Sequence, residues 1–368
     1  MEQIAETEPS RLKSIDVLRG FDMFFLVGAG DMLRNFFGAF HSESLQPVMN
    51  QLEHSWLGFT AWDIIMPLFL FTSGLSMPFS FEKYLSKHTK NQLYIKILKR
   101  FLLLFLLGWI AQGNLLDFDV KTFHIYCNTL HAIAFGYLIT SIIVLNINKL
   151  KIRIAVAALL VLVYWALLSF APTPGYGSGN FTPEGNFAMY IDRLVLGRFI
   201  DGMYYTWALS SLGFGATMVA GYFSGYILKQ SESCKHKLRL LFGIAITLII
   251  IGLLWTLQMP MIKPIWSPSM ILLSAGICYA LLALSYLITD KWHYNGIWIK
   301  GLRVFGLNSI AAYMLYETFR LNCISEYLLH GFRQSAGDFF PLVVSTGSFI
   351  ILYLILWFMY KHKIFLKV

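Results

Sequence analysis

Charge is scarce in this sequence. Asp, Glu, Lys and Arg make up only 13% of its 368 residues, whereas hydrophobic residues make up 57%. Soluble domains carry roughly 25% charged residues, so this composition excludes an ordinary soluble protein. Apolar stretches near membrane-spanning length recur along the whole chain, which predicts an all-α, polytopic integral membrane protein with about ten transmembrane helices. The expected spans cover approximately residues 17–37, 57–80, 97–114, 127–147, 152–171, 203–228, 240–258, 268–289, 300–320 and 340–360.

Cysteine is also scarce. The four cysteines stand far apart, at Cys127, Cys234, Cys278 and Cys323, without a C-x-x-C pair. This spacing argues against a disulfide framework and offers no metal-ligand set, so no metal is expected. The first ten residues, MEQIAETEPS, lack the apolar core and cleavage site of a signal peptide. The first span is therefore expected to act as a retained signal-anchor.

The chain lacks a loop long enough to fold as a separate soluble domain. Residues 1–368 are therefore expected to form a single transmembrane domain, with a short cytoplasmic tail at 1–13. An outward loop at about 172–202 contains the segment APTPGYGSGNFTPEGN, whose proline and glycine content is typical of loops. No inverted repeat of the kind found in many secondary transporters is visible.

The positive net charge of +9 is spread unevenly over the two sides of the expected membrane. With both termini placed in the cytoplasm, 22 of the 29 Lys and Arg residues fall on the cytoplasmic side, alternating loop by loop. This asymmetry follows the positive-inside rule and predicts a multi-pass protein of the plasma (inner) membrane. The charge therefore reports topology and contact with membrane lipid, and no nucleic-acid partner is expected.

The stretch HSWLGFTAWDIIMPLFLFTSGLSMPF, at residues 54–79, carries polar residues that a purely apolar span does not need. His54 and Trp56 are expected at the outer mouth of this span, with Asp63 two turns deeper. Pro67 removes the hydrogen bond to the carbonyl of Asp63, which favours a kink or a polar opening. A lone interfacial histidine is usually only an amphipathic anchor, but the carboxylate on the same element favours a functional site.

The first span contains two further groups of charges. Asp16, Arg19 and Asp22 recur at three-residue spacing, which lets Arg19 either bridge the two carboxylates as an interfacial anchor or meet a phosphate-bearing ligand. Near the outer end, Asp31 either pairs with Arg34 three residues on or lines a catalytic pocket. The residues alone leave both pairs of alternatives open.

The ninth span, RVFGLNSIAAYMLYETFR, predicts a polar helix face. Polar side chains recur there at three- and four-residue spacing, and Asn308 lies beside them. In the fourth span, His131 is expected to be a hydrogen-bonding residue between helices rather than a catalyst. The polar positions of the ninth span are Ser309, Tyr313, Tyr316, Glu317 and Arg320.

These segments resemble the heparan-α-glucosaminide N-acetyltransferase family and its uncharacterised bacterial relatives. RLKSIDVLRGFDMFF, at 11–25, is similar to the family's R-x-x-S-x-D-x-x-R-G opening, and HSWLGFTAWDIIMPLFLFTSGLS, at 54–76, to the motif that follows. Later segments agree in the same order, so the resemblance covers nearly the whole chain. They are LKRFLLLFLLGWI, NTLHAIAFGYLI, KPIWSPSMILLSAG and FGLNSIAAYMLYE.

The resemblance implies a transmembrane acetyltransferase. Members of that family take the acetyl group of cytoplasmic acetyl-CoA and deliver it to an amino sugar on the far side of the membrane, and the residue that matches His54 is their catalytic histidine. Two departures leave the acceptor open between an amine and a hydroxyl. The Gly30–Asp31 region replaces a family asparagine, and His131 with Ala132 replaces a Gln-Arg pair.

Roles follow for the residues singled out above. An imidazole suits proton removal near neutral pH, so we expect His54 to be the general base, with Asp63 or Asp31 orienting its ring; the alternative role is an acetyl carrier. Basic groups suit the phosphates of CoA, and the residues expected to contact them are Arg19, Lys99, Arg100 and Arg303. The residues expected to bind the acceptor are Trp56, Asn308, Tyr313 and Glu317.

Two other functions remain open from the sequence. An O-acyltransferase that decorates a surface or periplasmic glycan shares the same machinery. A sugar or ion transporter would use the polar cavity as a translocation site. The sequence also leaves room for a homodimer.

Overall fold

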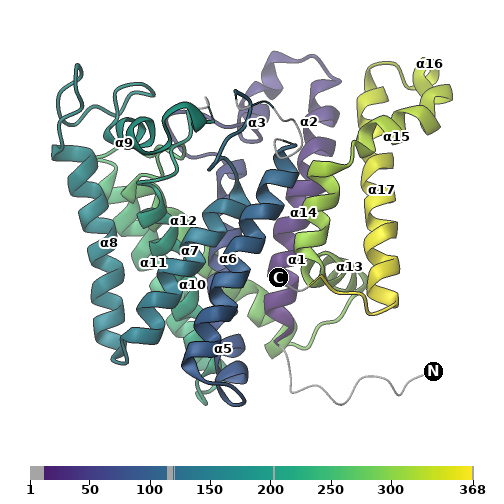
Figure 1. Ribbon diagram of the computed structural model, residues 1–368. Helices are drawn as coiled ribbons and strands as arrows, with labels where there is room; N and C mark the ends of the chain where they lie inside the picture. The colour runs from purple at the N-terminus through teal and green to yellow at the C-terminus, as the bar shows by residue number, and fades with distance from the viewer. Residues whose placement is uncertain (1–11, 114–118, 120, 202–203, 367–368) are drawn as a thin grey trace.

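The computed structural model describes residues 12–113, 119, 121–201 and 204–366. Most of the expected cytoplasmic tail at 1–13 lies outside these ranges. Within them the protein is helical, with no strand and a single β-bridge between Thr173 and Gly177. Figure 1 shows a bundle in which most long helices run between an upper and a lower face. The start of α1 (Lys13–Phe24) and the end of α17 (Phe340–Lys361) lie toward the same, lower face.

Each of the ten ranges expected to span the membrane overlaps at least one helix. By length and apolar composition, six helices of the described chain qualify as membrane spans: Ala61–Leu85, Thr129–Asn146, Leu150–Phe170, Cys234–Trp255, Pro268–Lys291 and Leu321–Lys361. Between α1 and α17, the α-helices in chain order are α2 Gly30–Gly38, α3 Gln46–Asn50, α4 Ile65–Leu75, α5 Met77–Leu85, α6 Lys90–Gln112, α7 Thr129–Asn146, α8 Leu150–Phe170, α9 Phe187–Leu196, α10 Ser211–Lys229, α11 Cys234–Trp255, α12 Pro268–Tyr286, α13 Ile297–Leu307, α14 Ser309–Thr318, α15 Leu321–Leu329 and α16 Arg333–Ala336.

Local sequence signals explain where several helices begin. Thr89 and Gln92 form a capping box at the start of α6. Asn128 accepts hydrogen bonds from the backbone N–H groups of Leu130 and His131 at the start of α7. Such caps satisfy amide groups that have no partner inside the helix, and each contributes about 1 kcal/mol.

The ninth expected span is broken rather than continuous. Asn308, with φ −123° and ψ 36°, separates α13 from α14. Figure 1 draws α13 nearly end-on beside the upright α14, so the two helices run in different directions. The predicted polar positions from Ser309 to Glu317 all follow this break and lie on α14, whereas Arg320 lies just beyond the helix, before α15.

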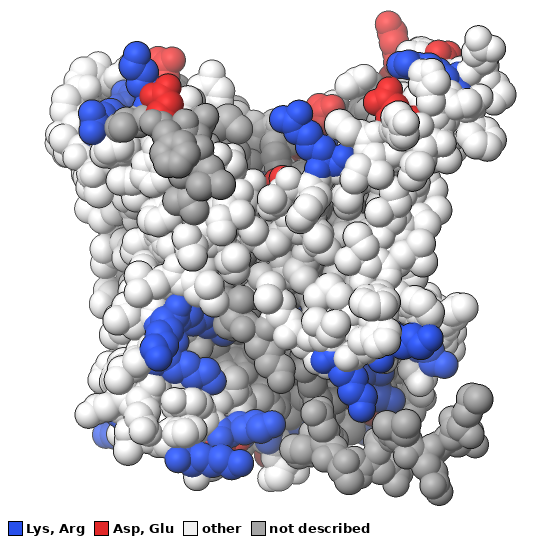
Figure 2. Space-filling model, turned by 45° about the vertical axis from the view of Figure 1, so that its right-hand side comes forward, with Lys and Arg blue, Asp and Glu red and all other residues white. Residues whose placement is uncertain are grey.

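Basic and acidic side chains concentrate at different levels of the bundle. On the face drawn in Figure 2, most Lys and Arg lie in the lower half, whereas most visible Asp and Glu lie at the upper rim. The lower face is also where α1 begins and α17 ends. This arrangement agrees with the uneven distribution of positive charge in the sequence.

Two glycines let α1 and α13 cross closely. A Cβ on Gly20 would fall against the carbonyl oxygen of Leu302, and a Cβ on Gly306 would fall against the carbonyl oxygen of Asp16. Both contacts are with backbone atoms, which cannot rotate away as a side chain can. Small residues at these positions therefore set the distance between the two helices.

We expect Gly306→Ala to destabilise the protein by about 1–3 kcal/mol, because the added methyl group forces the two backbones apart. Gly301→Ala, on the same helix, is the matched control. A Cβ at Gly301 would meet only the Tyr353 hydroxyl, at 3.8 Å, which is an ordinary contact. Thermal unfolding in detergent measures both variants, and equal midpoints would contradict the tight crossing.

Candidate active site

His54 lies on a loop, not inside a helix. Residues between α3 and the 3₁₀ turn Ala61–Ile64 form this loop at the upper face of the bundle, below the label α3 in Figure 1. Gly58, at φ +102°, donates its N–H to the carbonyl of Met261 at 2.9 Å. The hydroxyl of Thr60 donates to the carbonyl of Glu53, also at 2.9 Å. These bonds fix the loop against the segment that precedes α12.

Asp63 does not lie two turns inside the second span, as the sequence pattern predicted. The helix starts later than expected, so Asp63 sits in its first turn and forms a capping box with Thr60. Its Oδ2 atom accepts the N–H of Thr60 at 2.9 Å. Pro67 falls in the first turn of α4, where a missing N–H costs little, so it marks the junction of the two turns rather than a kink in mid-helix.

Three charged or titratable groups meet at this turn. His54 Nδ1 lies 2.9 Å from Asp63 Oδ1. The ammonium nitrogen of Lys263 lies 3.3 Å from the same carboxylate oxygen and 3.2 Å from His54 Nδ1. The structure therefore brings His54 and Asp63 together, and Lys263 joins them.

Burial differs sharply among the three side chains. Asp63 is 0% exposed and Lys263 is 5% exposed, whereas the His54 side chain is 42% exposed. Burial lowers the pKa of Lys263 from 10.5 to about 8, while the nearby Asp63 carboxylate acts in the opposite direction. A buried ion pair is tolerated when each charge has its partner in place. Asp63 and Lys263 thus form the buried part of the site, and the His54 imidazole lies on its solvent-exposed side.

The contact with Asp63 favours one tautomer of His54, in which the Lys263 ammonium, 3.2 Å from Nδ1, bonds to Asp63 rather than to the ring. Asp63 only accepts hydrogen bonds when ionised, and it faces donors from Thr60, Lys263 and His54. A proton on Nδ1 completes this set, and it leaves a lone pair on Nε2. That nitrogen has no hydrogen-bond partner among the described residues. The ring is therefore oriented to accept a proton or an acyl group on its open side.

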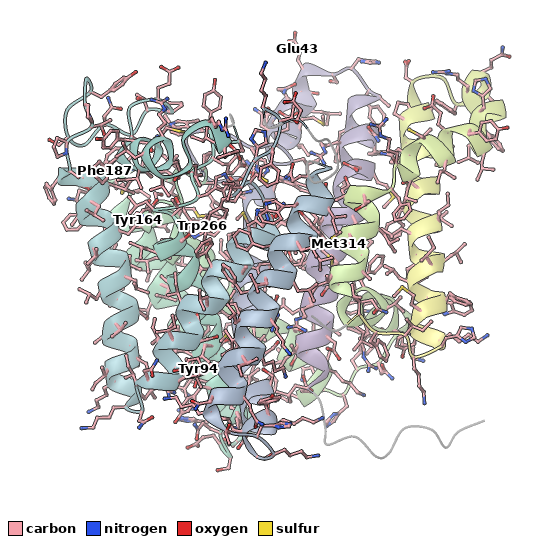
Figure 3. All side chains as sticks on the ribbon, viewed as in Figure 1. Glu43, Tyr94, Tyr164, Phe187, Trp266 and Met314 are labelled. Carbon is pink, nitrogen blue, oxygen red and sulfur yellow. The ribbon has the colours of Figure 1, made fainter. Side chains whose placement is uncertain are left out.

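The loop that carries Lys263 is held from within the bundle. Trp266, at φ +51°, donates its N–H to the carbonyl of Lys263 at 2.8 Å and its indole N–H to Thr217 Oγ1 at 3.1 Å. The Tyr164 hydroxyl donates to the carbonyl of Ile265. Both rings lie in the upper half of the bundle in Figure 3. Buried aromatic anchors of this kind fix Lys263 on a turn outside any helix.

One aromatic ring contacts His54, and two others, from residues near this pair in the sequence, pack together. Tyr205 packs edge-on against the imidazole with ring centres 6.1 Å apart. Trp56, one of the residues predicted to bind the acceptor, packs edge-on against Tyr204 at 6.2 Å and donates its indole N–H to the carbonyl of Phe181 at 3.1 Å. Burial, with a further contribution from Asp63, raises the pKa of the Tyr205 hydroxyl, which therefore stays neutral. Flat apolar rings beside a polar group suit the face of a sugar ring.

Asp31 serves a different set of partners from Asp63. Its carboxylate pairs with Arg34 at 2.7 Å and accepts the hydroxyl of Tyr316 at 2.7 Å. Arg34 in turn stacks over the Trp62 ring, with its guanidinium carbon 4.6 Å from the ring centre. Among the described residues, the carboxylate that orients His54 is thus Asp63 and not Asp31. The i, i+3 pair that the sequence offered as an alternative is present.

The other residues predicted to bind the acceptor do not gather at His54. Asn308 and Glu317 lie at opposite ends of α14, about 13 Å apart along the helix axis at 1.5 Å per residue. Asn308 is 1% exposed and accepts a hydrogen bond from the backbone of Leu366. Tyr313 is buried between them in the apolar core, and Glu317 is exposed in the last turn.

The four residues predicted to contact CoA occupy different surroundings. Arg19 donates to Ser76 Oγ at 2.6 Å and to the carbonyl of Thr72 on α4, and the Asp22 carboxylate has no partner in the described chain. The bridge predicted from Arg19 to Asp22 is therefore wrong. The Arg100 guanidinium lies 4.1 Å from the Tyr137 ring centre, and Lys99 is exposed. The Nε atoms of Arg100 and Arg303 are buried without an acceptor among the described residues.

His131 has the structural role that the sequence predicted. Its Nε2 lies 3.0 Å from the carbonyl of Phe105 on α6, and its Nδ1 accepts the N–H of Cys127 at 3.2 Å. Both ring nitrogens are therefore satisfied; the Nε2 contact joins α6 to α7, and the Nδ1 contact holds the residues just before α7.

Lys263 is the residue that the sequence reasoning missed as a site residue. It stands 209 positions from His54, in the segment KPIWSPSMILLSAG that contributed to the family resemblance. A signal was present, because Lys263 is one of only seven basic residues expected outside the cytoplasmic side. A buried cation on the less basic side of a membrane protein needs a partner, and the partner here is Asp63.

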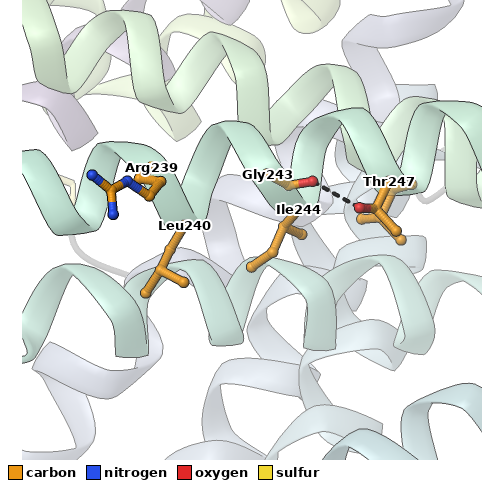
Figure 4. A pocket seen from close by; sticks show the side chains of 6 residues that line it. Arg239, Leu240, Gly243, Ile244 and Thr247 are labelled. Carbon is orange, nitrogen blue, oxygen red and sulfur yellow. Dashed lines mark hydrogen bonds between the residues drawn. The ribbon is translucent and has the colours of Figure 1, made fainter.

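Two surface hollows lie away from this site. One follows α11 and is lined by Leu240, Gly243, Ile244 and Thr247, where the Thr247 hydroxyl bonds to the carbonyl of Gly243 (Figure 4). The other lies between α15 and α17 and is lined mainly by aliphatic side chains. Neither shares a residue with the His54 site. Apolar walls of this kind on outward-facing helices suit lipid chains rather than chemistry.

Comparison with known proteins gives one partial match. A family model described as a domain of unknown function (DUF5009) matches residues 11–114. The matched part contains His54, Asp63 and Asp31 but ends well before Lys263. No curated protein matches the chain. The match covers less than a third of the sequence and assigns no chemistry to it.

Proposed function

We propose that this protein is a membrane acetyltransferase that moves an acetyl group from cytoplasmic acetyl-CoA to an amino sugar on the far side of the membrane. The observation that carries the proposal is the 2.9 Å contact of His54 Nδ1 with buried Asp63, which leaves Nε2 on the open side. The proposal includes ten spans with both termini in the cytoplasm. The sorting of positive charge between the two faces supports that topology.

His54 acts as the base in this mechanism. The acceptor nitrogen attacks the thioester carbonyl, His54 Nε2 takes the proton that the nitrogen loses, and the carbon–sulfur bond breaks. The proton then passes to the leaving thiolate of CoA. General bases of this kind accelerate reactions by about 10²–10⁴-fold. In the alternative, Nε2 attacks first and carries the acetyl group as an acetyl-imidazole, which the acceptor then cleaves.

Lys263 and Asp63 act as positioning residues for the imidazole. Asp63 accepts a hydrogen bond from the Nδ1–H group and so holds the ring, in the way a buried carboxylate orients a catalytic histidine in hydrolases. The ammonium of Lys263 balances the charge of Asp63 and disfavours a second positive charge on the ring 3.2 Å away. Together they keep a neutral imidazole ready to accept a proton.

In this proposal acetyl-CoA binds toward the cytoplasmic end of the bundle, away from His54. Three groups there, Arg100 Nε, Arg303 Nε and Asn308 Nδ2, are buried hydrogen-bond donors that lack an acceptor among the described residues. Buried donors without acceptors are costly, so such groups suggest a ligand rich in acceptors. Phosphate oxygens fulfil that requirement, and guanidinium groups bind them well.

One observation favours a hydroxyl acceptor as the second candidate. Among the described residues, the carboxylate in contact with His54 is already paired with Lys263 at 3.3 Å. The ion pair therefore offers no free negative charge to attract a protonated amine. A neutral sugar hydroxyl avoids this conflict, which supports O-acetylation of a glycan as the alternative reaction.

The decisive experiment uses purified protein and acetyl-CoA labelled in the acetyl group. Transfer to glucosamine with little transfer to neutral sugars supports the amine acceptor, whereas the reverse preference supports the hydroxyl acceptor. Proton- or sodium-coupled uptake of a solute into vesicles, without CoA release, would instead establish a transporter.

We expect Arg100→Gln and Arg303→Gln each to raise the KM for acetyl-CoA roughly tenfold, because a hydrogen bond to a charged group contributes about 1.5–3 kcal/mol. Lys90→Gln is the matched control, since Lys90 is exposed at the start of the same helix and is not among the residues predicted to contact CoA. Steady-state kinetics with varied acetyl-CoA measure all three. An unchanged KM in both arginine variants would remove these residues from the CoA site.

A further inference from the structure

The end of the chain folds back into the bundle. After α17 ends at Lys361, residues 362–366 run from its lower end toward α14 (Figure 1). The N–H of Ile364 donates to the carbonyl of Met359 at 2.8 Å, which turns the chain at the end of the helix. The N–H of Leu366 then donates to Asn308 Oδ1 at 3.3 Å. The last described residue therefore lies against the break between α13 and α14.

Buried donors without an acceptor among the described residues lie on Asn308 itself, on α13 and on α6. Asn308 is 1% exposed, and its Nδ2 has no acceptor among the described residues. Arg303 precedes it on α13, and Arg100 lies on α6, which packs against α14; the Nε atom of each is also buried without an acceptor in the described chain. The C-terminal segment satisfies the acceptor of Asn308 but not these donors. The segment therefore contacts Asn308 but leaves the buried donors without acceptors.

The segment is held weakly. Ile364 and Leu366 remain 49% and 46% exposed, so little apolar surface is buried. A neutral hydrogen bond such as the one from Leu366 to Asn308 adds little net stability, because it replaces hydrogen bonds to water. Bonds from arginine to phosphate are roughly twice as strong as neutral ones. A ligand with phosphate oxygens is therefore able to displace the segment.

We propose that residues 362–366 are a displaceable plug, which covers Asn308 at the break between α13 and α14 until an anionic ligand such as CoA replaces it. The identity of that ligand rests on the proposed function, whereas the closure does not. A protein that is open only part of the time binds its ligand more weakly, in proportion to the open fraction. Removing the plug will therefore tighten binding.

The first test measures binding of unlabelled CoA to the purified full-length protein and its variants by calorimetry. Leu366→Pro removes the N–H donor, whereas Leu366→Ala shortens the side chain and keeps the donor. We expect Leu366→Pro, and a chain that stops after Lys363, to lower the Kd several-fold, while Leu366→Ala keeps the wild-type value. Binding of CoA with one Kd in all four proteins overturns the plug.

The second test needs no CoA. Ser309→Cys places a thiol next to Asn308, and Cys234→Ser with Cys323→Ser removes the exposed cysteines. A charged, water-soluble methanethiosulfonate should modify this thiol faster when the chain stops after Lys363. Equal rates in the long and short chains overturn the plug. Faster modification without CoA binding in any variant supports the plug and removes CoA as the donor of the proposed reaction.

Discussion

Replacing His54 by alanine will lower the rate of acetyl transfer by about 10²–10⁴-fold, because the variant lacks the base that takes the proton of the acceptor. The fold should survive. The His54 side chain is 42% exposed, and the loop stays fixed by the bond from Gly58 to Met261. Initial rates with labelled acetyl-CoA, measured beside the Kd for CoA, separate a loss of chemistry from a loss of binding.

Ser55→Ala is the matched control for this variant. Ser55 is the next residue on the loop, is exposed, and donates its hydroxyl only to the carbonyl of Leu57 among the described residues. We expect it to keep wild-type activity. If His54→Ala transfers acetyl groups as fast as Ser55→Ala, His54 is neither base nor acetyl carrier. An acetylated enzyme that can be isolated in the wild type, but not in His54→Ala, selects the carrier.

Lys263→Met will have the second large effect. The variant leaves Asp63, at 0% exposure, without its ammonium partner, and breaking a buried pair costs about 3–5 kcal/mol. The uncompensated carboxylate also favours a proton on His54, so we expect the rising limb of the pH profile of kcat/KM to move to higher pH. Lys263→Arg keeps the charge and should move that limb less. A limb that stays in place in Lys263→Met would contradict the electrostatic role.

The stability of the wild type should also depend on pH through Lys263. Burial lowers its pKa from 10.5 to about 8 in the folded protein. Between these values the unfolded chain binds more protons, so this group makes stability rise with pH, by at most about 1.4 kcal/mol per pH unit. Below the folded pKa both states are protonated and the contribution is constant. Unfolding midpoints of the wild type minus those of Lys263→Met, from about pH 7 to about pH 10, test this slope.

Helical spans could be predicted because hydropathy and length act locally. Each expected apolar range overlaps a helix, and the cap at Asn128 is readable in the sequence. The start of the second span was predicted too early. Apolar residues continue upstream of Ala61, but Thr60 and Asp63 form the capping box that begins the helix there. Hydropathy alone does not show that the helix begins only at Ala61.

Pairing between segments was predicted less well. The spacing of Asp16, Arg19 and Asp22 suggested one ion-pair cluster, but the Asp22 carboxylate has no hydrogen-bond partner among the described residues, and Arg19 also donates to Ser76 and to the carbonyl of Thr72. Asp31 could equally have served His54 or Arg34, and it pairs with Arg34 and Tyr316. A helix period shows which residues share a face, but only packing decides what lies opposite that face.

The sequence by itself determined that this is a helical membrane protein, and it singled out His54 with Asp63 or Asp31 as its partner, because composition and short-range spacing act along the chain. Only the tertiary structure decided that Lys263 completes the site from 209 residues away and that the chain end reaches Asn308. Both contacts join segments that meet through the packing of whole helices. No local pattern encodes the distance between two such segments, so these contacts depend on the fold.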